Sequence, residues 1–152
     1  MSEQQAPSFS IQKLYLTDVS LEAPNSPGAF IEQEQAEITV QFQNQARSFE
    51  NNFFEVALKV TVQAKIQDRT LFLVEATQAG LFAIENIPQE ELDPLLGIGC
   101  PTIIFPYLRE AVSDLTTRAG FPPFILQAVN FEAFYMQQKA AQATENAPQT
   151  TH

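Results

Sequence analysis

The sequence is poor in the residues on which most enzymes depend. Its 152 residues include one histidine, one cysteine, five glycines and no tryptophan. The only histidine, His152, lies in the polar C-terminal tail, which argues against histidine-based acid–base chemistry and against a metal site. The lone cysteine, Cys100, excludes an internal disulfide and is typical of a reducing compartment.

Positive charge is also scarce. Eight Lys and Arg residues stand against 18 Asp and Glu residues, so the net charge is −10. Nucleic acids and anionic membrane surfaces attract clustered Lys and Arg, so neither is an expected partner. Residues 1–6 lack the basic and apolar segments of a secretory signal, and no apolar run approaches the roughly 20 residues that span a bilayer. We therefore expect a soluble, cytoplasmic protein.

The motifs of catalysis are missing as well. No glycine-rich turn ends in Gly-Lys-Ser or Gly-Lys-Thr, which excludes a P-loop ATPase. Cys100 has no evident neighbouring base, so packing in a core is favoured over a nucleophilic role. The pair Glu90-Glu91 is typical of a solvated helix start. No cofactor is expected, and an α+β enzyme that acts on acyl or other apolar substrates, with two carboxylates far apart in sequence, stays open as an alternative.

The first half of the chain alternates apolar and polar residues as strands do. Segments 36–43 and 54–66 each have one apolar and one polar face. The segment 70–84 follows after Gln67-Asp68-Arg69, which is short enough to force an antiparallel hairpin. Segment 11–21 is also extended, but its alternation shifts phase, which a β-bulge or contact on both faces would explain.

The second half is helical and contains a long uncharged stretch, Leu95 to Tyr107. Two glycines and two prolines in it predict a break between a short helix and a long one that begins near Pro101 or Pro106. Asp93-Pro94 predicts the start of the short helix and Gly120 the end of the long one. Asn130 predicts the N-cap of a last helix.

These elements predict an α+β fold, a four-stranded antiparallel sheet with helices packed on one face. We expect one domain over residues 9–143, with polar tails over residues 1–8 and 144–152 that are flexible. The face of the sheet without helices is polar and acidic in places. It is expected to be solvated or to bind a partner.

Four blocks of the chain resemble, in the same order, those of the SecB family of bacterial protein-export chaperones. The most characteristic block runs from Cys100 to Glu110, and the others are Leu21–Asn25, Gly80–Phe82 and Val129–Ala133. The resemblance covers about residues 9–136. It implies the SecB-like fold, assembled as a homotetramer, a dimer of dimers whose long helices meet in the middle.

The resemblance implies a cytoplasmic holdase that works without ATP, catalysis or cofactor. Such a chaperone keeps secretory precursors unfolded and delivers them to the SecA motor at the membrane. Exposed apolar grooves that accept many sequences suit this task, and weak contacts repeated along one client combine. An alternative within the same family is a chaperone that serves a toxin–antitoxin system.

The resemblance also implies roles for individual residues. The SecA-docking residues are Asp18, Glu22, Leu73 and Glu75. The candidates for the client groove, which fit core or interface packing equally well, are Phe30, Ile31, Ile103, Phe105 and Tyr107. The candidates for the oligomer interface are Val74, Ala76, Gln78, Leu108, Val112 and Leu115. Glu34 stands where members often carry a tryptophan, so the groove lining is expected to differ in detail.

Overall fold

The structure is a computed structural model that describes residues 5–145. Its strands are β1 (Ser8–Glu22), β2 (Glu37–Phe49), β3 (Phe53–Ile66) and β4 (Arg69–Glu85). Its helical segments are η1 (Gly28–Phe30), η2 (Glu50–Asn52), α1 (Gln89–Pro94), η3 (Leu95–Gly99), α2 (Cys100–Arg118) and α3 (Phe131–Glu145). Residues 1–4 and 146–152, with His152, half of the expected N-terminal tail and most of the expected C-terminal tail, lie outside the described residues.

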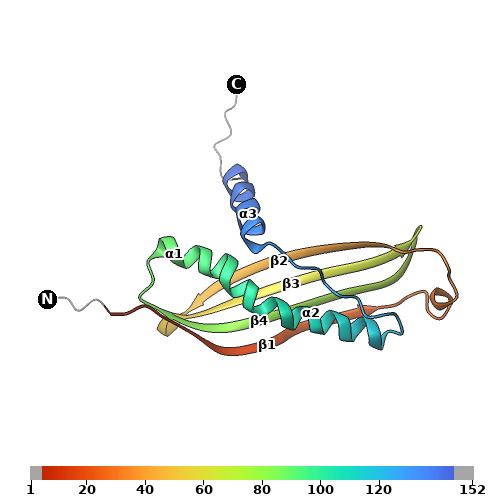
Figure 1. Cartoon of the computed structure of the whole chain (residues 1–152), viewed down its shortest axis with the longest axis horizontal. Helices are drawn as coiled ribbons and strands as arrows, with labels where there is room; N and C mark the ends of the chain where they lie inside the picture. Colours follow the sequence, from red (N-terminus) through yellow and green to blue (C-terminus); the bar gives the residue numbers. More distant parts are fainter. Residues whose placement is uncertain (1–4, 146–152) are drawn as a thin grey trace, which may run out of the picture.

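The four strands form one antiparallel sheet in the order β1-β4-β3-β2. The tight connection Gln67-Asp68 joins β3 to β4, and Gln67 adopts a φ of 55° to make the turn. This confirms the expected hairpin. Since β1 and β2 lie at opposite edges, residues 23–36 must cross the end of the sheet, and we call them the crossing loop (Figure 1).

The phase shift expected in the first strand is present as two irregularities of pairing. The register of β1 against β4 slips between Ile11 and Lys13 and again between Leu16 and Asp18. Each slip lets one extra residue in β1 pass without a partner, so the strand changes which side chains face the helices. As a result Leu14 and Leu21 both pack against the core although they are seven residues apart.

One face of the sheet carries the helices and the core. Alternate residues of β3 on this face, from Val56 to Val62, have no exposed surface, and α2 covers them with Cys100, Ile104, Leu108 and Val112, which are also fully buried. Figure 1 shows α1 and α2 running along the sheet while α3 projects away from it. The expected sheet with helices on one face is therefore confirmed for the single chain.

The uncharged stretch is helical throughout. The helix begins at Gln89 rather than at Asp93, so the predicted start is wrong, and Pro94 lies inside α1. A π-helical turn, η3, separates α1 from the long helix α2. The long helix begins at Cys100, next to Pro101, which is one of the two expected starting positions. The break is thus a widened turn and not a loop, because Leu92, Leu95 and Leu96 stay packed against the core.

The other predicted helix ends are confirmed. Gly120 follows α2 with a φ of 95°, a conformation that glycine adopts readily. Asn130 caps α3, since its side-chain oxygen Oδ1 accepts a hydrogen bond of 3.0 Å from the Ala133 N–H. The twelve-residue connection 119–130 between α2 and α3 has no regular structure.

The helical run Gln89–Arg118 is long and apolar enough to cross a membrane by length and composition. The sequence expectation, which considered only uninterrupted apolar runs, did not foresee this. One side of the run is packed on the sheet, where Ile104 and Leu108 are fully buried. Packing on the sheet therefore explains part of the apolar character of the run Gln89–Arg118.

Candidate functional site

The face of the sheet that the helices leave uncovered, here called the open face, brings the four predicted docking residues together. Glu22 of β1 lies opposite Leu73 of β4, and Glu75 lies two residues further along β4 on the same face. Asp18 pairs with Thr77, the next open-face position. We call Asp18, Glu22, Leu73 and Glu75 the docking surface; both carboxylates of β1 are exposed, and Leu73 and Glu75 are half-buried.

Further along the open face, a polar network ties three strands together. The Tyr15 hydroxyl reaches over β4 and donates a hydrogen bond of 2.5 Å to Glu55 Oε2 on β3. Arg47 Nε on β2 donates one of 2.9 Å to Glu55 Oε1. The hydrogen bond from Tyr15, aided by Arg47, lowers the pKa of Glu55, whereas burial and this carboxylate raise the pKa of Tyr15 to about 12. Near neutral pH, Glu55 is therefore ionised and the Tyr15 hydroxyl keeps its proton.

Of the groove candidates, Phe30 and Ile31 lie in the crossing loop, as expected. Phe30 packs on Phe121, with ring centroids 5.2 Å apart, and Phe121 packs on Phe72 at the same separation. A side chain at Gly120 would collide with the Phe30 ring, because its Cβ would lie 2.8 Å from that ring. Phe30 is still 49% exposed and Ile31 is 79% exposed. The crossing loop therefore presents apolar surface beside an aromatic cluster.

The three groove candidates on α2 do not join this cluster. Phe105 is buried between Phe42 of β2 and Phe131 of α3, and Ile103 is half-buried against the core. Tyr107 is 49% exposed. Within one chain, Phe105 is thus a core residue.

Most of the oligomer-interface candidates are also buried within one chain. Five of the six lie beneath or on the inner side of α2 and are at most 6% exposed: Val74, Ala76, Gln78, Leu108 and Val112. Leu115 is half-buried. The three strand residues among them, Val74, Ala76 and Gln78, lie on the helix side of β4.

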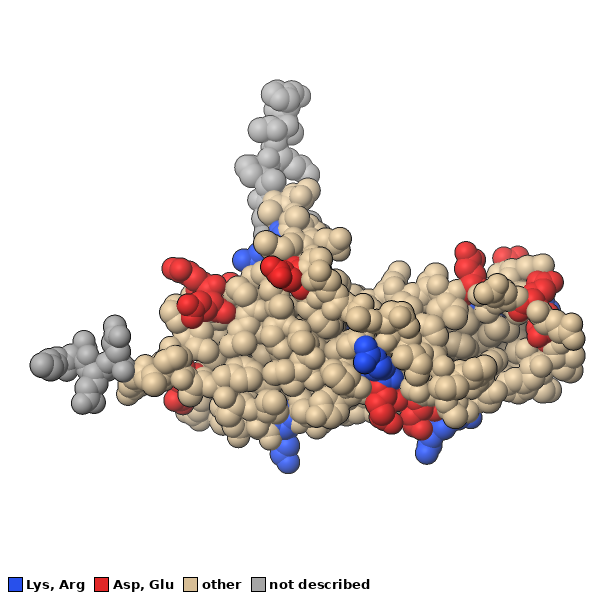
Figure 2. All heavy atoms as spheres, in the orientation of Figure 1, with Lys and Arg blue, Asp and Glu red and all other residues tan. Residues whose placement is uncertain are grey.

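Exposed apolar side chains gather instead along the two edge strands, on the side that bears the helices. On β1 they are Phe9, Ile11, Leu16 and Val19, each between 37% and 46% exposed, and on β2 they are Ile38 and Val40. Figure 2 shows this side of the molecule as largely uncharged, with most of the Lys, Arg, Asp and Glu residues toward its rim and one basic side chain near its middle. Sequence analysis missed these edge residues because alternation alone cannot tell a covered position from an uncovered one.

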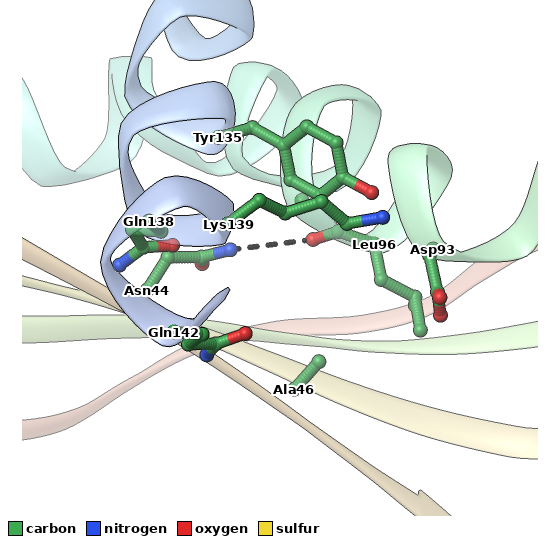
Figure 3. A pocket seen from close by; sticks show the side chains of 9 residues that line it. Asn44, Ala46, Asp93, Leu96, Tyr135, Gln138, Lys139 and Gln142 are labelled. Carbon is green, nitrogen blue, oxygen red and sulfur yellow. Dashed lines mark hydrogen bonds between the residues drawn. The ribbon is translucent and has the colours of Figure 1, made fainter. Parts of the chain in front are cut away.

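A cavity of about 340 Å³ lies where α3 meets β2 and η3 (Figure 3). Tyr135 of α3 packs so closely on Gly97 that a Cβ there would lie 2.3 Å from its ring. Asn44 of β2 donates a hydrogen bond of 3.3 Å to the Leu96 carbonyl, and its Oδ1 and the Tyr135 hydroxyl are buried without partners. None of the nine lining residues is Ser, Cys or His, so this cavity offers no nucleophile of those types.

The described residues hold little other reactive chemistry. Burial raises the pKa of the Cys100 thiol to about 12, so this side chain is an inert core group. Between residues 5 and 145, no three His, Cys, Asp or Glu side chains lie together in a way that could hold a metal ion. The arrangement is suited to binding through surfaces.

Comparison with known proteins agrees with a role in binding. The family model described as "Preprotein translocase subunit SecB" matches residues 2–142. The protein-export protein SecB of Chromobacterium violaceum is 56% identical over 145 residues, which are 94% of this chain and 97% of that protein. That of Thiobacillus denitrificans is 48% identical over the full length of both.

The chain belongs to the SecB family. It is therefore a protein-export chaperone of a cytoplasmic, non-enzymatic family, which sets aside the α+β enzyme. The fold agrees with that of a solved SecB-like chaperone from Mycobacterium tuberculosis, in complex with a ChAD peptide from an antitoxin. The TM-score is 0.65 at 21% identity over 80% of this chain and 87% of that one.

Within this SecB family member, sequence reasoning missed two further features of the site besides the apolar edge residues. Phe72 and Phe121 complete the aromatic cluster beneath Phe30. For Phe121 the sequence does hold a clue, because this residue directly follows Gly120, where the chain turns. Lys59 lies next to the docking surface, with Nζ 3.8 Å from Glu75 Oε2. Its polar position in the alternation of β3 already places it on the open face.

Proposed function

We propose that this chain holds secretory precursors unfolded, without ATP, and delivers them to SecA while assembled as a dimer of dimers. The observation that carries the proposal is the separation of two surfaces. Exposed apolar side chains lie on the crossing loop and on the helix side of the edge strands, whereas the acidic docking surface lies on the open face. A client and a basic partner can therefore bind at the same time.

Client binding is supported by the kind of apolar surface that the chain presents. Phe30 and Ile31 offer large uncharged area without a hydrogen-bond requirement, and the edge strand β2 has one unpaired side. An unfolded chain can satisfy its main-chain groups at such an edge whatever its sequence. Several weak contacts along one client then add up through effective concentration.

Assembly is supported by the apolar edge of β1. Four exposed apolar side chains beside an unpaired strand edge form the sort of surface that soluble proteins cover. The exposed side of α2, with Tyr107, supplies a second surface for the pairing of dimers. Native mass spectrometry at micromolar concentration tests this: we expect four chains, and a monomer would contradict it.

The holdase activity is tested by dilution of a chemically unfolded secretory precursor, followed by light scattering. One tetramer per precursor is expected to suppress aggregation without ATP. Unchanged scattering at stoichiometric amounts would remove the proposal. An unrelated toxin–antitoxin client serves as the comparison, and the export relatives at about half identity lead us to expect weaker protection of that client.

SecA docking is tested by Glu75→Lys, which reverses a charge in the docking surface. Binding to SecA is expected to weaken by tenfold or more, about 1.4 kcal/mol, while client holding is retained. Glu37→Lys is the matched control, because Glu37 is an exposed open-face carboxylate of β2, the strand at the far edge of the sheet. Equal loss from both variants, or loss of client holding with SecA binding, would assign Glu75 a general or structural role instead.

A further inference from the structure

The docking surface contains a cation that the sequence analysis did not assign. Lys59 on β3 pairs in register with Thr77 of β4, which in turn lies opposite Asp18 of β1. Its ammonium group lies 3.8 Å from Glu75 Oε2, diagonally across the strands. An acidic surface suited to a basic partner therefore holds one of its own carboxylates in an internal ion pair.

The other basic side chains that the described open face offers are placed differently. Arg47 is committed to Glu55 at 2.9 Å, three strands away from Asp18. Lys65 lies near the β3–β4 turn, where it pairs in register with Glu37 and Thr70. Lys13 of β1 pairs in register with Leu81, two open-face positions from Asp18, and none of the four ion pairs among the described residues includes it. Arg69 begins β4 opposite the buried Ile66 and forms an ion pair with Glu32 of the crossing loop. Among these cations, Lys59 alone contacts a residue of the docking surface.

The pair is too exposed to be needed for folding. The side chains of Lys59 and Glu75 are 39% and 37% exposed, and ion pairs at such positions contribute between nothing and about 1 kcal/mol to stability. The same half-exposure leaves Glu75 reachable by a partner. An incoming basic side chain must then share or displace the ammonium of Lys59, and two cations at one carboxylate repel each other.

We propose that Lys59 limits the affinity of docking by competing with the partner's basic side chain for Glu75. The inference rests on the proposed docking of SecA at this surface. The partner's chemistry is a protein segment that presents Lys or Arg to the open face. Lys59 is an affinity-limiting residue in this sense: it weakens the contact of the partner with Glu75 and so makes release of the partner easier.

The test compares two variants that remove the same charge from the same face of the same strand. Binding of the full-length chain to SecA is measured by calorimetry at low salt for the wild type, Lys59→Gln and the control Lys65→Gln. We expect Lys59→Gln to bind about two- to fivefold more tightly, since that is the range of an exposed ion pair. Lys65→Gln should change the affinity by less than half of that effect.

Coupling to Glu75 gives a second readout. In the background Glu75→Gln, the tightening by Lys59→Gln is expected to disappear, because the carboxylate for which the two cations compete is gone. Equal tightening by both lysine variants, weaker binding of Lys59→Gln, or a gain that persists without Glu75 would overturn the inference. Urea unfolding of Lys59→Gln should match that of the wild type, which separates the binding effect from a structural one.

The failure of this inference can be told from the failure of the proposed function. If the wild type does not bind SecA, docking at this surface is wrong and the inference falls with it. If the wild type binds and Glu75→Lys weakens binding, but Lys59→Gln leaves the affinity unchanged, only the role of Lys59 is overturned.

Discussion

The two faces of the sheet are made by the same four strands but have opposite uses. On the helix side, Leu58 and Val60 are fully buried, and the core depends on them. On the open face, Lys59 and Thr61 alternate with them and stay half-buried, and Lys59 forms an ion pair with Glu75. A strand can therefore serve stability with one set of side chains and partner binding with the other, because successive residues point to opposite faces.

This contrast also explains why the docking surface tolerates charge in the middle of strands. Glu75 is flanked in sequence by Val74 and Ala76, both buried on the helix side. The carboxylate points to the open face, where water and Lys59 solvate it. A substitution one residue to either side would change the core instead of the surface.

The largest expected effect comes from the same substitution made on the two faces. Leu58→Ala removes a fully buried side chain and should lower the free energy of unfolding by about 2–5 kcal/mol. Leu81→Ala, on the open face of the neighbouring strand, removes a half-buried side chain and should cost about 1 kcal/mol. Urea unfolding of both variants measures this. Equal losses would mean that the open face is covered in solution, for example by another subunit.

A smaller effect is expected in the helix layer itself. The buried Thr116 hydroxyl donates to the Val112 carbonyl at 3.0 Å and accepts the Phe124 N–H at 2.9 Å, which fastens the connection 119–130 to α2. Thr116→Val leaves the N–H without a partner and should cost about 1–3 kcal/mol in urea unfolding.

Thr117→Val is the matched control for that variant. Thr117 is exposed, and its hydroxyl donates only to the Ser113 carbonyl of its own helix. Its loss should change the unfolding free energy by less than about 0.5 kcal/mol. Equal costs for Thr116→Val and Thr117→Val would show that the hydrogen bond to Phe124 does not hold the connection.

The smallest effect is expected from the polar network of the open face. Because the folded pKa of Glu55 is lowered from 4.5, its contribution to stability is present above that pH and is lost as the pH falls through the lowered folded value. Glu55→Gln should therefore cost at most about 1 kcal/mol at pH 7, and the difference from the wild type should shrink in acid. Unfolding midpoints measured from pH 7 to pH 3 test this. A difference that grows in acid would contradict the assignment.

The same network gives an alkaline control. Since the pKa of Tyr15 is raised from 10.0 to about 12 in the folded chain, its contribution to stability is fully present below pH 10 and is lost as the pH rises from there to about 12. Tyr15→Phe should remove that part of the stability loss above pH 10. Identical alkaline unfolding curves would show that Tyr15 does not titrate differently in the two states.

Much of the fold could be predicted because alternation is a local signal. The strands around Phe54–Ile66 and Thr70–Ile84 appear in the structure within one residue at each end, and the phase shift in β1 was visible as a change of alternation. The start of the first helix was not predictable in this way. Asp93-Pro94 is a good local start, but Leu92, Leu95 and Leu96 gain more by packing on the core as one helical run with a π-turn.

Of the candidate site, the docking carboxylates could be predicted, but their ion pairing and the exposure of the groove residues could not. Asp18, Glu22 and Glu75 came from the family resemblance, and their grouping follows from the register of β1 against β4. The pairing of Lys59 with Glu75 depends on a diagonal across two strands, which no local pattern reveals. Likewise, whether Phe105 or Phe30 is exposed depends on what α3 and the connection after α2 cover.

The sequence by itself determined the class of the protein. Its acidic charge, its single histidine, its lack of a glycine-rich phosphate-binding motif, its strand and helix periodicities and its family can all be read from it. These are properties of composition and of neighbours along the chain. Only the tertiary structure decided which apolar residues are core and which are exposed, and which cation meets Glu75. The reason is that burial and ion pairing depend on residues brought together from distant strands, and alternation specifies a face without specifying what covers it.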